Sequence, residues 1–376
     1  MILTTCAACA APLAHNAPRC VRCHTRYCNK TCQMDHWRRG HKQICKRIHR
    51  GGNAEQYYAE KKYKEAVAVA VEACAADTKG QTCYICTQAL HWKTKEGLVR
   101  MCACRGTAGF AHVSCLAEQA KILLAEAEEN NLDLKTQNAR WQRWDRCGLC
   151  EQMYHGPVKC ALGWACWKTY LGRPEDDGVR IMAMSVLGNG LALVGQHEDA
   201  LSVRDAELSA SRRFGITERH ILIVQGHIAI TYEQLGRFED ALRILKDVHC
   251  GCLKLYGEEH ERTLRAANNC ARNLVHAQRH EEAKSRVRTL MPVARRVLGE
   301  SHSITLTMRL IYAGALYRDD DATLEHIREA VNELEDADRI ARRVFGGAHP
   351  LTKGMEAELP RARAALRARE TPSTSA

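Results

Sequence analysis

The second half of the chain repeats its apolar and polar positions at a fixed period. The similar segments QHEDAL (196–201), RFEDAL (237–242), RHEEAK (279–284) and IREAV (327–331) place their alanines 41, 42 and 47 residues apart. Glycines at 215, 257, 299 and 346 are spaced 42, 42 and 47. Such a period is typical of stacked helix pairs, each covering an apolar face of its neighbour. Both markers gain five residues in the last unit, which predicts one insertion near residues 319–325.

Other segments also have helical patterns. Residues 54–76 are rich in helix formers and apolar on one side, which predicts a spacer helix. Residues 116–135 again look helical, so the long gap before Cys147 is expected to be ordered. Residues 158–170 are apolar and aromatic and are expected to dock this region onto the next part of the chain. We expect a capping helix over 350–368 and a disordered tail over 369–376.

The chain contains 20 cysteines, many of them in C-x2-C pairs. Without a secretory signal, this clustering indicates metal sites over disulfides. One group has the order C-x2-C, C-x-C, H-x2-C, C-x2-C and consists of Cys83, Cys86, Cys102, Cys104, His112, Cys115, Cys147 and Cys150. Zinc takes four such ligands in a tetrahedron, and each pair supplies two of them. The group therefore predicts two zinc sites.

A second group of eight ligands lies within residues 1–50. It consists of Cys6, Cys9, Cys20, Cys23, Cys28, Cys32, His41 and Cys45. A segment of this size buries too little apolar surface to fold alone, and each structural zinc contributes about 10–16 kcal/mol. We therefore expect four zinc ions per chain. The same segment has ten Lys and Arg against one acid, so it holds +9 of the formal net charge of +11.

The segment YCNKTCQMDHWRRGHKQIC (27–45) closely resembles a MYND finger. The resemblance implies that Cys6, Cys9, Cys28 and Cys32 share one zinc, and that Cys20, Cys23, His41 and Cys45 share the other. His36 is left beside the site or on the surface. Gln33 and Trp37 match the family residues that line a shallow groove for proline-containing peptides. The alternative is that Trp37 only covers the zinc centre.

The ligand order over 83–150 and the segment CACRGTAGFAHVSCL (102–116) resemble the variant RING finger of MARCH-type ubiquitin ligases. That family pairs Cys83, Cys86, His112 and Cys115 on one zinc, and Cys102, Cys104, Cys147 and Cys150 on the other. Ile85 and Leu149 match the family's apolar contacts for a ubiquitin-conjugating enzyme. Three features depart from the family. They are the 31 residues between Cys115 and Cys147, the missing tryptophan near Gln119, and Glu151 where many active RING fingers place a cation.

A PHD finger has the same ligand types in the same order, but its spacing differs. PHD fingers have two to four residues between the third and fourth ligands, whereas one residue separates Cys102 from Cys104. They have four or five residues before the histidine, whereas seven precede His112. The PHD interpretation is therefore the weaker one.

The phrase AITYEQLGRFEDAL (229–242) resembles a tetratricopeptide repeat. The motif G-x-x-H-x-x-T, at 257–263 and 299–305, looks like the long repeats of kinesin light chains, and the resemblance implies a peptide-binding surface. His260, His302 and His349 recur once per unit and cannot meet at one metal ion, so we expect turn and capping roles. Six cysteines outside the ligand groups are expected to be buried apolar thiols, namely those at 74, 160, 166, 250, 252 and 270.

The predicted fold class is mainly α, with two small cross-braced zinc modules followed by an α-solenoid of tetratricopeptide-like helix pairs. The expected modules are a MYND-like finger (1–50), a helical linker (51–80), a variant-RING-like finger with a helical insertion (81–155), a docking helix (156–176), the repeats with their capping helix (177–368) and the tail (369–376).

No catalytic nucleophile or phosphate-binding loop is recognisable, and both metal groups have four ligands per ion. The favoured function is a RING-type ubiquitin ligase that forms no covalent intermediate and recruits substrates through the finger and the repeats. The alternatives are a non-enzymatic interaction scaffold and a PHD-like chromatin reader. Nucleic-acid binding is less favoured, because Tyr27 and Trp37 are too few aromatics for a stacking platform. No signal peptide or membrane span is visible, which indicates the cytoplasm or the nucleus.

Overall fold

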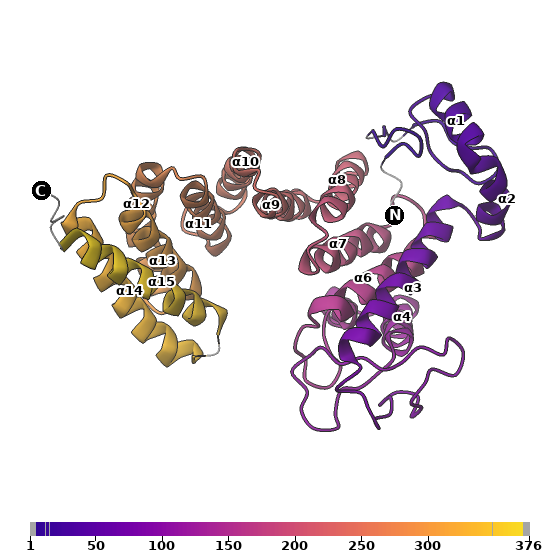
Figure 1. Cartoon of the computed structure of the whole chain (residues 1–376), viewed down its shortest axis with the longest axis horizontal. Helices are drawn as coiled ribbons and strands as arrows, with labels where there is room; N and C mark the ends of the chain where they lie inside the picture. The colour runs from indigo at the N-terminus through magenta and orange to yellow at the C-terminus, as the bar shows by residue number, and fades with distance from the viewer. Residues whose placement is uncertain (1–4, 12, 15, 348, 371–376) are drawn as a thin grey trace, which may run out of the picture. The chain divides into compact units, whose positions relative to one another are not determined.

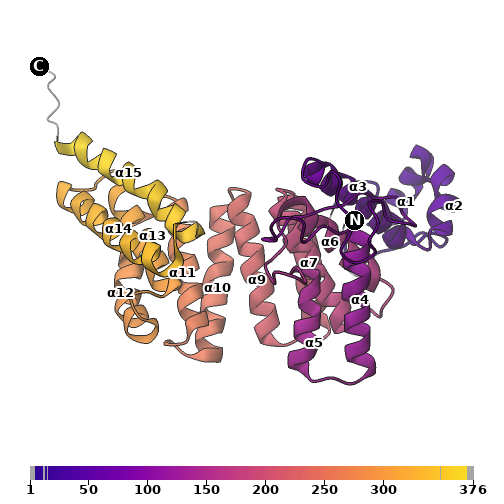
Figure 2. The same cartoon turned by 90° about the horizontal axis from the view of Figure 1, so that it is seen from below.

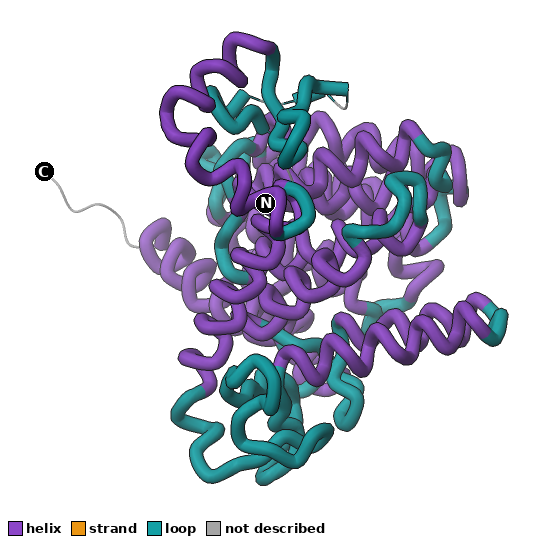
Figure 3. Tube along the Cα trace, turned by 90° about the vertical axis from the view of Figure 1, so that its right-hand side faces the viewer, coloured by secondary structure: helices purple, strands orange, loops and turns teal. Residues whose placement is uncertain are grey.

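The computed structural model describes residues 5–11, 13–14, 16–347 and 349–370. These residues form helices joined by loops, and strand pairing among them is confined to isolated bridges at Arg19–Arg26, Val99–Ala111 and Arg146–Met153. The chain divides into two compact units, residues 1–224 and 225–376, which we describe separately (Figure 1). Figure 3 shows helices throughout, with loops gathered in a few places. The prediction of a mainly α fold is confirmed.

The first unit begins with a small finger built on two helices. Helix α1 (Lys30–His36) starts at Asn29, whose side chain accepts a hydrogen bond from the Cys32 N–H at 2.9 Å. A π-helical turn, η1 (Trp37–His41), leads into α2 (Lys42–Arg50). Gly40 bends the chain between them with φ of 127°, a conformation that side chains rarely adopt. The finger core is small and includes Tyr27, Ile48 and Ala54.

Helix α3 (Ala54–Cys74) connects this finger to the rest of the unit. Its buried residues are three or four positions apart, at 59, 63, 67, 70 and 74, so they form one apolar stripe. Helix α6 (Gly156–Tyr170) packs against this stripe and also against α7 (Gly178–Leu193). Helix α6, which covers the segment 158–170, therefore lies between α3 and α7.

Two glycines allow α6 and α7 to pack very closely. A Cβ on Gly163 would lie 3.0 Å from the Leu187 Cα, and a Cβ on Gly190 would lie 2.9 Å from the Cys160 Cα. Side chains at either position would force the helices apart, because real Cβ atoms rarely come this close. Buried residues of α3, α6, α7 and α8 (His197–Arg213) belong to one hydrophobic cluster.

The gap between Cys115 and Cys147 is ordered, as the sequence predicts, but it forms a helical hairpin where one helix was expected over 116–135. Helices α4 (Val113–Glu129) and α5 (Leu134–Trp141) run side by side in opposite directions, followed by the short η2 (Gln142–Trp144) (Figure 2). The Arg140 guanidinium donates to the Leu123 carbonyl at 3.0 Å and pairs with Glu126 at 2.9 Å. The rings of Trp141 and Trp144 lie 5.7 and 5.8 Å from that of Tyr170 on α6.

A buried ion pair joins α6 to the loop before Cys147. Lys159 is completely buried, and its ammonium group contacts the Asp145 carboxylate. The Asp145 carbonyl also accepts a hydrogen bond from the Tyr154 N–H at 2.9 Å. A buried cation needs such a partner, because desolvation of an unpaired charge is very costly.

The second unit is a stack of antiparallel helices, to which α9 (Glu218–Gln234) leads. Its helices are α10 (Phe238–Tyr256), α11 (Glu261–His276), α12 (His280–Leu298), α13 (Ser303–Tyr317), α14 (Leu324–Phe345) and α15 (Pro350–Glu370). Each packs on the next, and α13 also packs on both α11 and α15. The arrangement is that of stacked helix pairs, with α15 on the outermost pair.

A turn of the same design links the helix pairs. Helices α10, α12 and α14 end at Gly257, Gly299 and Gly346, with φ of 84°, 88° and 79°. The histidine that follows each glycine begins the next helix, because its Nδ1 accepts a backbone N–H. The distances are 3.1 Å to Arg262 for His260, 3.2 Å to Ile304 for His302 and 3.2 Å to Leu351 for His349. The predicted turn and capping roles of these histidines are confirmed.

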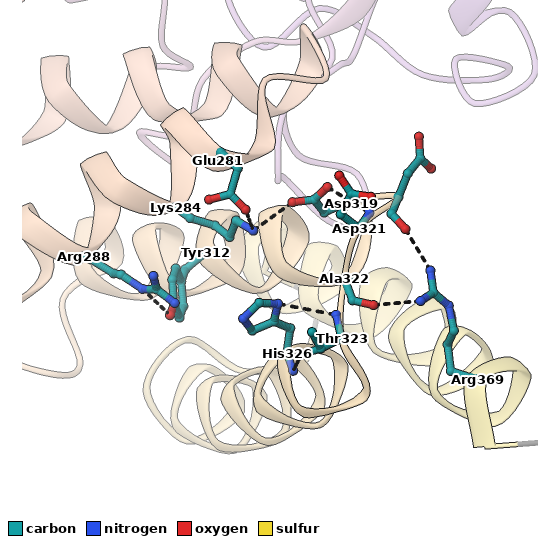
Figure 4. Close-up of polar contacts among 11 residues, drawn as sticks. Glu281, Lys284, Arg288, Tyr312, Asp319, Asp321, Ala322, Thr323, His326 and Arg369 are labelled. Atoms are coloured by element: carbon teal, nitrogen blue, oxygen red, sulfur yellow. Dashed lines mark hydrogen bonds and ion pairs between the residues drawn. The ribbon is translucent and has the colours of Figure 1, made fainter.

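The predicted insertion lies between α13 and α14, where hydrogen bonds and ion pairs hold the connecting loop (Figure 4). The buried Lys284 binds Asp319 at 2.8 Å and also contacts Glu281. Arg369 of the capping helix donates to the carbonyls of Ala322 at 2.8 Å and Asp320 at 2.9 Å. The extra residues therefore form an ordered loop and a longer α14, which has 22 residues against 19 in α10 and α12.

Cysteine burial and the C-terminal tail depart in part from expectation. Cys250 is exposed, so its assignment as a buried thiol is wrong, whereas the other five cysteines in that set are buried. Positions 250 and 252 lie about 200° apart on a helix, so one apolar face cannot cover both. Helix α15 includes residues 369 and 370, and the rest of the expected tail lies outside the described residues.

None of the described helices combines the length and hydropathy needed to cross a bilayer.

We expect Gly299→Ala to lower the free energy of unfolding by about 1–2 kcal/mol, because alanine at φ of 88° is strained. Gly314→Ala is the matched control. Gly314 is inside α13, and no atom lies within 4 Å of an added Cβ, so this change should stabilise by about 0.5–1 kcal/mol. Urea unfolding of both variants measures the difference, and equal effects would contradict the turn design.

We expect Asp145→Ala to destabilise the first unit by about 3 kcal/mol, because it leaves the buried Lys159 without a partner. Lys159→Met removes the charge and keeps the volume, so its cost should stay below about 1 kcal/mol. Urea unfolding followed by tryptophan fluorescence compares the two. A larger loss in Lys159→Met than in Asp145→Ala would show that the ion pair does not work in this way.

Candidate metal centres and adjoining surfaces

Four clusters of cysteine and histidine side chains are present in the first unit. Within each cluster the candidate ligand atoms all lie within 4.8 Å of one another. The clusters are Cys6, Cys9, Cys28 and Cys32; Cys20, Cys23, His41 and Cys45; Cys83, Cys86, His112 and Cys115; and Cys102, Cys104, Cys147 and Cys150. In both modules alternate ligand pairs meet, which is the cross-braced arrangement that the two resemblances imply.

The C-x2-C turns of the clusters share one design. In the four turns, the residue after the second cysteine has a left-handed backbone, with φ between 56° and 62°. These residues are Ala10, His24, Thr87 and Glu151. The N–H of each donates to the carbonyl of the first cysteine at 2.8–3.1 Å. The sequence analysis missed this conformation, because non-glycine residues rarely adopt it.

The two histidines in the clusters use different ring nitrogens. The Nε2 of His41 lies 3.3 Å from the Cys23 sulfur, whereas the Nδ1 of His112 lies 3.4 Å from the Cys86 sulfur. Burial lowers the pKa of both imidazoles, which favours the neutral form that binds metal. His36 is outside the clusters, where its ring stacks on His41 at 4.8 Å and bonds the Tyr27 hydroxyl at 3.0 Å. It therefore supports a candidate ligand.

One thiol in each cluster has a lowered pKa. Burial raises the pKa of Cys6 and Cys150, but backbone N–H groups outweigh it and bring the values to about 6 and about 7. In Cys20 and Cys83, hydrogen bonds from backbone N–H groups again outweigh burial and lower the pKa. A thiolate is the form that binds metal. Three or four sulfurs with at most one imidazole are the donor set of a closed structural zinc site, so the residues present fit zinc.

A shallow groove of about 630 Å³ lies over the second cluster of the finger. Its lining, which we call the finger groove, consists of Cys20, Val21, Arg22, His24, Gln33, Trp37, Cys45, His49 and Gly52. The Trp37 ring lies 5.9 Å from that of His41 and is 38% exposed. Trp37 therefore both contacts a candidate ligand and forms part of a groove, so the two alternatives for this residue are compatible.

Ile85 and Leu149 project from two neighbouring cysteine turns. Both are exposed, at 36% and 52%. A Cβ added to Gly148 would lie 3.6 Å from the Tyr84 hydroxyl and 3.7 Å from the Gln119 side-chain oxygen. Tyr84 and Gly148, the neighbours of Ile85 and Leu149 in sequence, therefore lie close together, with Gln119 of α4 beside them.

A further exposed apolar pair, Leu90 and Trp92, lies in the loop after Cys86 and was not singled out in the sequence. These side chains are 58% and 69% exposed. Between them His91 turns inward, and its ring lies 5.3 Å from that of His112. The Thr94 N–H donates to the His91 Nδ1 at 3.1 Å. The loop therefore covers a candidate ligand with one side chain and exposes the two beside it.

Comparison with family models gives three matches along the chain. The MYND finger model matches residues 6–45, the RING-variant domain model matches 83–133, and a tetratricopeptide repeat model matches 220–296. The RING-variant match ends before Cys147 and Cys150, which the structure brings back to Cys102 and Cys104. Comparison with curated proteins gave no match.

Among solved structures, BtubC (BKLC) from P. vanneervenii is 16% identical, with 58% of this chain and 95% of that chain covered and a TM-score of 0.43. The kinesin light chain TPR-like repeats from Podosopora anserina are also 16% identical, with 62% and 98% covered and a TM-score of 0.42. The chain thus combines a MYND finger, a RING-variant domain and tetratricopeptide repeats, with four cysteine and histidine clusters that fit zinc.

Proposed function

We propose that this protein is a RING-type ubiquitin ligase whose RING-variant domain binds a ubiquitin-conjugating enzyme through Ile85 and Leu149. Both side chains are exposed on neighbouring cysteine turns, and this observation carries the proposal. Large exposed apolar side chains that project from a rigid frame are typical of protein-binding surfaces. The sixteen clustered residues are the proposed ligands of four structural zinc ions.

The ligase contributes no covalent chemistry. Each cluster supplies four ligand atoms, so a bound zinc would have no open position for water or substrate and would only fix the turns that carry the contact residues. Ubiquitin passes from the bound conjugating enzyme to a lysine of the substrate. The finger groove, with Gln33 and Trp37, and the repeats hold the protein substrate.

A cation is available near the position where active RING fingers carry one. Glu151 has the opposite charge, but the Arg146 guanidinium donates to the Glu151 carbonyl at 3.1 Å. In the proposed ligase, Arg146 is the cation that offsets the charge of Glu151 and contacts ubiquitin.

The second candidate is a non-enzymatic scaffold that uses the same modules only for binding. Gln119 favours it, because an amide flanks the Gly148 turn where the family has a tryptophan contact. No observation favours a PHD-like chromatin reader, since the RING-variant model matches over residues 83–133.

We expect four zinc ions per chain by elemental mass spectrometry of the purified protein. Cys45→Ser and Cys104→Ser should each lose one, because each removes a thiolate from a different cluster. The exposed Cys250 lies outside the clusters, so Cys250→Ser should keep all four. Full zinc content in both cluster variants would refute the ligand assignment.

We expect Ile85→Ala and Leu149→Ala each to slow autoubiquitination at least about tenfold, because each removes part of the conjugating-enzyme contact. Zinc content should not change, since neither side chain is a ligand. Leu134→Ala is the matched control, as Leu134 is 76% exposed on α5. If zinc-loaded protein forms no chains with any conjugating enzyme in a broad panel, the scaffold is the correct function.

A further inference from the structure

We propose that the finger groove selects acidic peptides, so that the proline-containing segment it binds carries Asp, Glu or phosphorylated side chains beside its apolar residues. This inference rests on the proposed role of the groove as a peptide site and adds the charge of its ligand.

The lining of the groove combines apolar and basic side chains. Val21 is 93% exposed and Trp37 is 38% exposed, so both offer apolar surface to a ligand. Arg22, His24 and His49 also line the groove, and the lining contains no carboxylate. A ligand that covers Val21 and Trp37 therefore meets the positive Arg22 guanidinium at its edge.

Two lysines of α2 extend this basic rim. At 100° per residue, Lys42 lies within about 20° and Lys46 within about 60° of His49 around the helix axis. Both are exposed, and neither has a carboxylate partner among the described residues. They are thus free to pair with acidic groups of a ligand that lies along the groove.

The finger itself does not neutralise this charge. Its one acid, Asp35, binds Arg39 at 2.6 Å and is not part of the groove. Two zinc ions add four positive charges and seven thiolates add seven negative ones, so the +9 of the side chains becomes +6. A surface of one sign attracts ligands of the other and speeds their association.

The aromatic content favours a peptide over nucleic acid. Single strands stack successive bases on several exposed aromatic rings. Tyr27 is fully buried and bonds His36, so Trp37 is the one tryptophan, tyrosine or phenylalanine ring of the finger that a ligand can reach among the described residues. One ring beside Val21 suits an apolar peptide side chain.

The test uses the full-length zinc-loaded protein and two fluorescent peptides measured by anisotropy. Both contain the same two prolines and a leucine, and the flanking residues are Asp and Glu in one and Asn and Gln in the other. We expect the acidic peptide to bind about tenfold more tightly at about 50 mM salt, and the difference to shrink at about 500 mM. Equal affinities at low salt would overturn the inference and leave peptide binding intact.

Charge-reversal variants locate the effect. Lys42→Glu with Lys46→Glu should abolish the preference for the acidic peptide while the affinity for the neutral peptide stays within about twofold. Arg47→Glu, about 160° from His49 on α2, is the matched control and should keep the preference. Elemental analysis confirms that each variant keeps its zinc. An unchanged preference in the double variant would overturn the inference.

Two further arms separate the other outcomes. Trp37→Ala should weaken both peptides; if neither peptide binds the unmodified protein, the groove is not a peptide site and the proposed recruitment role of the finger fails. Single- and double-stranded DNA oligonucleotides should bind more weakly than the acidic peptide at about 150 mM salt. Tighter binding of an oligonucleotide that depends on Lys42 and Lys46 would identify nucleic acid as the ligand and overturn the inference.

Discussion

The first unit depends on metal–thiolate bonding. Both zinc modules contain long loops, and the apolar core of the finger is too small to offset the loss of conformational entropy on folding. Four ligands on one ion replace the missing core, and the C-x2-C turns prepare for this with backbone N–H groups that favour thiolates. Ile85 and Leu149 lie in these turns, and Trp37 lies in η1 beside the candidate ligand His41. The surfaces that we assign to partner binding are therefore consequences of coordination.

The second unit is stabilised in a different way. Its helices bury alanines and branched aliphatic residues against one another, and each turn between pairs combines a left-handed glycine with a capping histidine. Local contacts dominate such stacks. The loop between α13 and α14 shows that the array tolerates added residues where Lys284 and Arg369 can bind the exposed backbone and carboxylates.

The sequence predicted the features that depend on pattern, and it missed those that depend on tertiary packing. Ligand spacing and family resemblance gave all four clusters, and the 42-residue period gave the turns and the insertion. Cys250 shows the limit, because a cysteine's usual preference for burial does not say which helix face is covered. Lys159 lies within an apolar stretch, and only the structure shows that its ammonium group is buried against Asp145. The close approach at Gly163 and Gly190 likewise requires knowledge of the facing helix.

The glycine contact between α6 and α7 has a mechanical consequence. Because α6 also packs on α3 and shares one hydrophobic cluster with Cys83, Cys115 and Cys147, no hinge separates the RING-variant domain from the first helix pair. The RING-variant domain and this helix pair therefore form one rigid unit. A protein bound to α7 or α8 would stay at a set distance from Ile85 and Leu149. In the proposed ligase, the shape of the bound substrate would then decide which of its lysines accepts ubiquitin.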